Sequence, residues 1–133
     1  IWQNVAKRGR LNDEPVCQGC LLMHPPRPAA LISSEALNTL RASQRMLLIT
    51  FTGPHCAICK RLAPMLSTVL NEYADQLDAV KIDVEAFESL AVEFAVRSLP
   101  TTLLLRGDVE LGRIAGFATA GQLRHWISAQ IDA

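Results

Sequence analysis

The sequence lacks the features that mark membrane-spanning or nucleic-acid-binding proteins. No apolar run reaches the roughly 20 residues that a helix needs to cross a bilayer, and no signal peptide is visible. Thirteen Lys and Arg residues balance thirteen Asp and Glu residues, so net charge gives no reason to expect nucleic acid or an anionic membrane as a partner. Half of the residues are hydrophobic, which is enough to form the core of one globular domain.

Cysteine is also scarce, with four residues in a chain of 133. That number is small for a secreted protein held together by disulfides. The four residues form two C-x-x-C pairs, Cys17–Cys20 and Cys56–Cys59, with none left over. Two such pairs indicate redox chemistry or metal binding.

A proline-rich segment divides the chain. Pro25-Pro26-Arg27-Pro28 holds three prolines in four residues, a composition that favours a stiff, extended spacer. We therefore predict two parts: an irregular extension over residues 1–28 with the first cysteine pair, and a folded domain over residues 29–133 with the second pair.

The folded part is predicted to be an α/β domain. Hydrophobic periodicity indicates strands at residues 46–51, 79–84, 101–105 and 109–115, and helices that begin near Ser34, Cys56, Phe87 and Thr119. The apolar spacing of the second helix extends to Leu77. Thr119 and Gln122 form a capping-box pattern, and Gly112 predicts a bulge in the last strand. A parallel start followed by an antiparallel hairpin predicts a mixed sheet with helices on both faces.

The second cysteine pair meets the requirements of thiol–disulfide exchange. This chemistry needs a thiolate that attacks a disulfide and a second thiol that releases the mixed disulfide. Cys56 follows a strand and Gly53-Pro54, and it opens a long helix, whose N-terminus stabilises a thiolate. We predict that Cys56 is the attacking thiol and Cys59, one turn further on, the resolving thiol. The alternatives are a structural disulfide or half of a zinc site.

Four further motifs complete a pattern known from one family. Pro64 stands eight residues after the first cysteine of the pair, and Leu99-Pro100-Thr101 places a proline before the hairpin strand. Gly116 follows the hairpin, and Gly121-Gln122-Leu123 begins the last helix. With the C-x-x-C pair they resemble thioredoxin from about Ala29 to Ala133. The resemblance implies a thioredoxin fold and a protein-disulfide oxidoreductase that requires no organic cofactor.

The resemblance also implies a substrate-binding loop and a set of partners. Pro100 would carry a cis peptide bond beside the dithiol, and the backbone of Leu99 would pair with an extended substrate segment. The partners would be protein disulfides and a reductase, or a membrane thiol carrier outside the cytoplasm. The sequence leaves the compartment undecided, with the bacterial cytoplasm slightly favoured over the periplasm.

Four positions depart from the thioredoxin pattern. His55 replaces the usual Trp before the first cysteine, Ala57-Ile58 replaces Gly-Pro, and Thr50 replaces a buried Asp that helps to deprotonate the resolving cysteine. His55 is a candidate for thiolate stabilisation or proton transfer, or simply an exposed residue of the substrate-binding rim. Because a Thr hydroxyl is not a general base at neutral pH, resolution is slower here or another group such as His55 serves. These departures support an alternative function, a binding or chaperone-like adaptor with weak redox activity.

The first cysteine pair resembles half of a zinc ribbon that one thioredoxin subfamily carries ahead of its catalytic domain. Asn4, Arg10-Leu11 and Pro15-Val16-Cys17 follow that pattern, and the missing half would precede Ile1. Two cysteines fill only two of the four positions around a structural zinc. Three interpretations stay open for Cys17 and Cys20: part of a complete ribbon in a longer protein, a disulfide with or without exchange with Cys56–Cys59, or a zinc shared by two chains.

Overall fold

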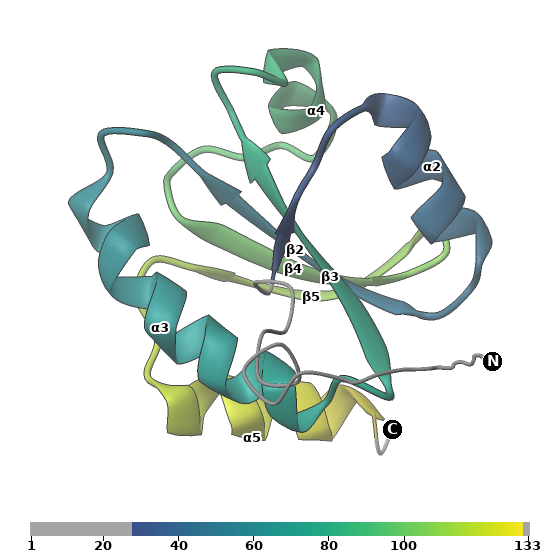
Figure 1. Cartoon of the computed structure of the whole chain (residues 1–133), viewed down its shortest axis with the longest axis vertical. Coiled ribbons are helices and arrows are strands. Elements are labelled where there is room, and N and C mark those ends of the chain that lie inside the picture. Colours follow the sequence, from purple (N-terminus) through teal and green to yellow (C-terminus); the bar gives the residue numbers. More distant parts are fainter. Residues whose placement is uncertain (1–27, 132–133) are drawn as a thin grey trace, which may run out of the picture.

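The computed structural model describes residues 28–131 and shows helices on both faces of one central sheet (Figure 1). Along the chain the elements are β1 (Ala29–Ala30), α2 (Ser34–Ala42), β2 (Met46–Thr52), α3 (Ala57–Glu72), β3 (Leu77–Asp83), α4 (Glu88–Glu93), β4 (Thr101–Arg106), β5 (Val109–Ala115) and α5 (Ala120–Ile131). The predicted α/β architecture is confirmed. Cys17, Cys20 and nearly all of the predicted extension lie outside the described residues.

The sheet is mixed and has the strand order β1-β3-β2-β4-β5. β1, β3 and β2 run parallel, whereas β4 pairs antiparallel with β2 and β5 antiparallel with β4. Helices α3 and α5 cover one face of the sheet and α2 and α4 cover the other (Figure 1). β2 is therefore hydrogen-bonded on both edges and covered on both faces, and its C-terminal end leads directly into the second cysteine pair.

Each face of the sheet has its own apolar core. Side chains alternate across a strand, so successive residues of β2 enter different clusters. Met46 and Leu48 pack with α3 and α5, whereas Leu47, Ile49 and Phe51 pack with α2 and α4. The nearly continuous apolar run of β2 follows from burial on both sides.

Several boundaries differ from the sequence prediction. Helix α2 is capped by Ser33 rather than Ser34, because the Ser33 hydroxyl accepts a hydrogen bond from the Ala36 N–H at 3.1 Å. Helix α3 ends at Glu72, and Leu77 begins β3. Leu77 is buried in the same cluster as the inward face of α3, so its apolar character fitted either element. The two-residue strand β1 was too short to produce a sequence pattern.

The hairpin and the last helix follow the prediction closely. The bulge in β5 falls at Leu111, next to Gly112, because Leu104 pairs with Gly112 and Leu105 with Glu110. The capping box is present: the Thr119 N–H donates to Gln122 Oε1 at 2.9 Å, and the Gln122 N–H donates to Thr119 Oγ1 at 3.2 Å.

Candidate active site

Cys56 and Cys59 form a disulfide at the N-terminus of α3. Cys56 is the N-cap residue, with an extended backbone (φ −98°, ψ 104°), and its Sγ accepts a hydrogen bond from the Cys59 N–H at 3.2 Å. The two Cα atoms are 5.2 Å apart, within the usual range for a disulfide. The Cys59 N–H thus points at the Cys56 sulfur, and together with the N-terminus of the helix it stabilises negative charge there once the disulfide is reduced.

The two sulfurs differ in exposure. Cys56 is half-buried, whereas Cys59 lies one turn into the helix with only 7% of its surface exposed. An incoming disulfide therefore reaches Cys56 more readily than Cys59. This is the asymmetry expected of an attacking and a resolving thiol.

The segment Leu99-Pro100 lies beside the loop that carries the disulfide. The Leu99–Pro100 peptide bond is cis, as predicted. The next residue, Thr101, begins β4 and pairs with Phe51 at the end of β2. A Cβ atom added to Gly53 would lie 3.0 Å from Leu99 Cδ1, so this glycine allows the two loops to approach closely. The Pro100 carbonyl accepts a hydrogen bond from the Gly116 N–H at 2.7 Å.

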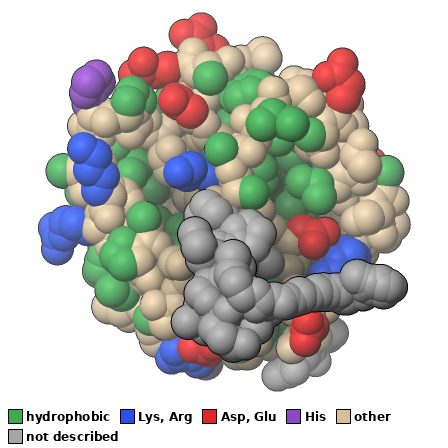
Figure 2. Space-filling model, viewed as in Figure 1, with side chains coloured by type: hydrophobic (Ala, Val, Ile, Leu, Met, Phe, Trp, Pro, Cys, Tyr) green, Lys and Arg blue, Asp and Glu red, His purple; other side chains and the backbone are tan. Residues whose placement is uncertain are grey.

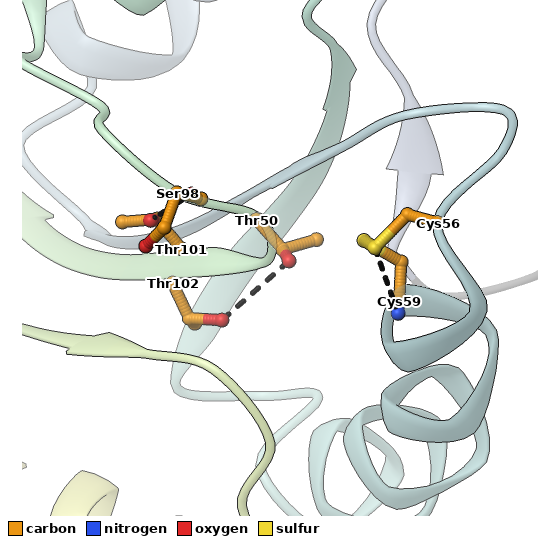
Figure 3. Close-up of a disulfide and its surroundings, with 6 residues drawn as sticks. All are labelled: Thr50, Cys56, Cys59, Ser98, Thr101 and Thr102. Atoms are coloured by element: carbon orange, nitrogen blue, oxygen red, sulfur yellow. Dashed lines mark hydrogen bonds between the residues drawn. A yellow bond between two sulfur atoms is a disulfide. The ribbon is translucent and has the colours of Figure 1, made fainter.

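Thr50 is buried, and Figure 3 shows it between Thr102 and the disulfide. Its hydroxyl is engaged across the sheet, because Thr102 Oγ1 donates a long hydrogen bond of 3.5 Å to Thr50 Oγ1. Figure 3 shows the Thr50 oxygen turned toward Thr102 and its methyl group on the side of the disulfide. Thr50 therefore presents an apolar group to the sulfurs.

An exposed rim surrounds the disulfide. His55, Ala57 and Ile58 are all exposed, Ile58 to 44%. Nearby, the Arg61 guanidinium lies over the Phe117 ring, 5.4 Å from its centroid. On the face shown in Figure 2, several acidic side chains lie near the top and several basic side chains lie at the left.

A cleft of about 400 Å³ opens beside Cys59. We refer to it as the Cys59 cleft, and its polar lining besides Cys59 consists of Thr50, Thr52, Lys60, Lys81 and Asp83. Lys81 and Asp83 were not predicted as site residues from the sequence. The signal was present in the alternation of β3, where these charged residues are interleaved with the buried Val80 and Ile82.

Two kinds of site are not seen in the part of the chain that the structure describes. Within residues 28–131 no group of three or more His, Cys, Asp or Glu side chains is placed to hold a metal ion. Within the same residues, no helix has both the length and the apolar character needed to span a membrane.

The fold and the helix-capping dithiol agree with what comparison with known proteins shows. The family model for thioredoxin matches residues 29–129. The chain belongs to the thioredoxin family.

Thioredoxins from bacteria and plants are among its relatives. Thioredoxin C-3 of Corynebacterium nephridii is 30% identical over 131 residues, which cover 98% of this chain and 90% of the relative. The bifunctional thioredoxin reductase/thioredoxin of Mycobacterium leprae is 36% identical over 75 residues, which cover 56% of this chain and 16% of that protein. The crystal structure of thioredoxin NaTrxh from Nicotiana alata, 30% identical, superposes with a TM-score of 0.71 and covers 81% of this chain and 96% of that chain.

Membership of the thioredoxin family fixes the class of reaction. The protein is a thiol–disulfide oxidoreductase whose redox-active C-x-x-C pair, Cys56 and Cys59, is present here as the disulfide. The sequence prediction of a thioredoxin-fold oxidoreductase is confirmed.

Proposed function

We propose that the protein exchanges disulfides in protein substrates, with Cys56 as the attacking thiol and Cys59 as the resolving thiol. The Cys56 thiolate attacks one sulfur of the substrate disulfide, and the other sulfur leaves as a thiolate. Cys59 then attacks Cys56 Sγ and releases the second substrate sulfur, so that two electrons pass to the substrate. No organic cofactor is needed, because the dithiol itself carries both electrons. The observation that supports these roles is the difference in exposure at the helix N-cap.

The loop that contains Leu99 and Pro100 is the proposed docking site for the substrate backbone. It lies against Gly53, three residues before Cys56. Pro100 has no N–H, so the peptide groups before it are those available to pair with an extended substrate segment. The exposed rim residues, His55 among them, would contact the substrate side chains.

A reductase is the proposed source of electrons. One relative joins a thioredoxin reductase and a thioredoxin in a single chain, which supports a reductase as the partner of this protein. A membrane thiol carrier is the other donor that the chemistry allows. Reduction of the oxidised protein by a purified bacterial thioredoxin reductase and NADPH tests the first donor; no NADPH oxidation above background would count against it.

The activity is tested by insulin reduction in the presence of dithiothreitol. We expect the wild-type protein to accelerate insulin precipitation, and Cys56→Ser to reduce that acceleration to background. The thermal midpoint of Cys56→Ser should stay close to that of the reduced wild-type protein, which shows that the variant is folded. Equal rates for the two proteins would instead favour a binding or adaptor role.

His55 is proposed to assist Cys56 as well as to line the rim. It immediately precedes Cys56 and is exposed, and a protonated imidazole near the sulfur would stabilise the thiolate. The test is the rate of Cys56 alkylation by iodoacetamide as a function of pH in the wild-type protein and in His55→Ala. An unchanged pH profile would restrict His55 to a contact residue.

Cys17 and Cys20 are proposed to belong to an N-terminal element that this chain shares with some relatives. The alignment with thioredoxin C-3 covers 98% of this chain, so it runs through most of residues 1–28, which supports a shared N-terminal element such as the zinc-ribbon half. Two thiolates do not complete a tetrahedral zinc site, so zinc binding requires two further ligands. Zinc content per chain together with a free-thiol count separates a zinc site from a disulfide.

A further inference from the structure

The resolving thiol needs a group that removes its proton, and the structure excludes Thr50 from that task. Cys59 is 7% exposed, and a buried thiolate is disfavoured unless charges or hydrogen bonds compensate. The hydroxyl of Thr50 is bonded to Thr102 at 3.5 Å, and a neutral hydroxyl is in any case a poor base. The proton acceptor must therefore lie elsewhere around Cys59.

The Cys59 cleft brings charged groups to the same side of the sheet as the disulfide. In the register of β2 and β3, Thr50 lies opposite Lys81 and Thr52 lies opposite Asp83. Val80 and Ile82, which alternate with them, belong to the core under α2 and α4. Lys81 and Asp83 therefore face α3, and both line the cleft together with Cys59.

We propose that Asp83 accepts the proton of Cys59 through water in this cleft during resolution, and that Lys81 favours the resulting thiolate. The inference rests on the proposed roles of Cys56 and Cys59. In the step, the Cys59 proton passes to the Asp83 carboxylate and the Cys59 thiolate attacks Cys56 Sγ. The bond between Cys56 and the substrate breaks, the substrate sulfur leaves as a thiolate, and Asp83 returns its proton to solvent.

The size and charge of the cleft fit this step. Its volume of about 400 Å³ compares with about 30 Å³ for one water molecule in the liquid. The titratable groups that face it are Lys60 from α3 and Lys81 and Asp83 from β3, while β2 adds only hydroxyls. A Lys ammonium has no acceptor site, so the carboxylate of Asp83 is the charged group of this lining that can accept a proton.

Asp83 is held in place by the backbone that follows it. Its Oδ1 accepts a hydrogen bond from the Glu85 N–H at 2.8 Å, which leaves Oδ2 outside that bond. An Asn side chain can accept the same hydrogen bond through its own Oδ1. Asp83→Asn therefore removes the base while it keeps the turn, and it is the informative variant.

The test separates attack from resolution with the aromatic disulfide 5,5′-dithiobis(2-nitrobenzoic acid). The full chain carries Cys17→Ser and Cys20→Ser in every arm, so that only the active-site thiols react. Attack by Cys56 releases a first nitrothiobenzoate and resolution by Cys59 releases a second, which stopped-flow absorbance resolves in time. The matched control is Glu85→Gln, which removes a neighbouring carboxylate outside the cleft lining.

We expect Asp83→Asn to slow the second release at least about tenfold at pH 7, since general bases commonly contribute a hundredfold or more. The first release should stay unchanged, and the deficit should vanish above about pH 9, where free thiols ionise without help. Glu85→Gln should behave as the parent does. Equal second-release rates in the two variants would overturn the inference, whereas loss of the first release in the parent would overturn the proposed function.

Lys81→Gln tests the inference without any change at Asp83. It should shift the pH midpoint of the second release upward and leave the first release unchanged. An unshifted midpoint would contradict the role of the cleft, even if Asp83→Asn failed to fold.

Discussion

The two faces of the sheet differ most where β2 and β3 approach the disulfide. On the α2/α4 face, Leu47, Ile49 and Phe51 of β2 are fully or almost fully buried and apolar to the end of the strand. On the α3/α5 face, Met46 and Leu48 begin in the same way, but Thr50 and Thr52 follow. The α2/α4 face therefore stabilises the fold by apolar packing as far as the active site. The α3/α5 face instead places polar groups around the reacting sulfurs.

β3 likewise has an apolar face and a charged face. Val80 and Ile82 enter the α2/α4 core, whereas Lys81 and Asp83 line the cleft on the α3/α5 face. Phe51 adds an aromatic contact on the α2/α4 face, because its ring centroid lies 5.8 Å from that of Phe94 in a tilted arrangement. Substitutions on the two faces should therefore separate stability from catalysis.

The largest effect on stability is expected for Phe51→Ala. Phe51 is 0% exposed, so the truncation loses apolar burial and leaves a cavity at a cost of about 3–5 kcal/mol. Urea unfolding followed by circular dichroism measures the change in the free energy of unfolding. A cost below about 1 kcal/mol would contradict a large contribution of the α2/α4 core to stability, since typical single substitutions already reach that size.

A much smaller effect is expected one residue earlier, for Thr50→Val. The change is nearly isosteric and removes a long hydrogen bond, so the free energy of unfolding should fall by at most about 1 kcal/mol. The same urea titration measures it, and insulin reduction should persist because Thr50 has no proton-transfer role here. A loss of activity with stability retained would show that Thr50 takes part in catalysis.

The smallest effect is expected for Glu72→Gln, at the junction of α3 and α5. Arg124 donates to both carboxylate oxygens at 2.7 Å, and this hydrogen bonding lowers the pKa of Glu72 below its ordinary value of 4.5. The pair is exposed, so its contribution is small and screened by salt.

The sign of the pH dependence at Glu72 follows from the lowered pKa. The stabilisation is present above the ordinary pKa and is lost as pH falls through the pKa of the folded protein. The wild-type thermal midpoint should exceed that of Glu72→Gln slightly at neutral pH, and the two should converge in acid. A gap that widens in acid would show that Arg124 does not act through the charged carboxylate.

Much of the fold was predictable because its signals are local. The apolar run 46–51 identified a strand buried on both faces, and the spacing of Thr119 and Gln122 identified a helix start that the structure confirms. The end of α3 was not predictable, since Leu77 is buried whether it extends a helix or begins a strand.

The active site too was predictable only in part. Cys56 and Cys59 were found from their spacing and their position after a strand, which is local information. The contribution of Asp83 depends on the register of β2 with β3 and on the volume between β3 and α3. Neither quantity can be read from a single strand, so the charged lining of the cleft became visible only in three dimensions.

The central claim is that Cys56 attacks and Cys59 resolves, and trapping the intermediate tests it most directly. Cys59→Ser should accumulate a mixed disulfide with a substrate disulfide, and peptide mapping by mass spectrometry should locate the adduct on Cys56. Cys56→Ser is the control and should accumulate none under the same conditions. An adduct on any other cysteine of the Cys59→Ser protein, or no adduct while exchange activity continues, would contradict the account.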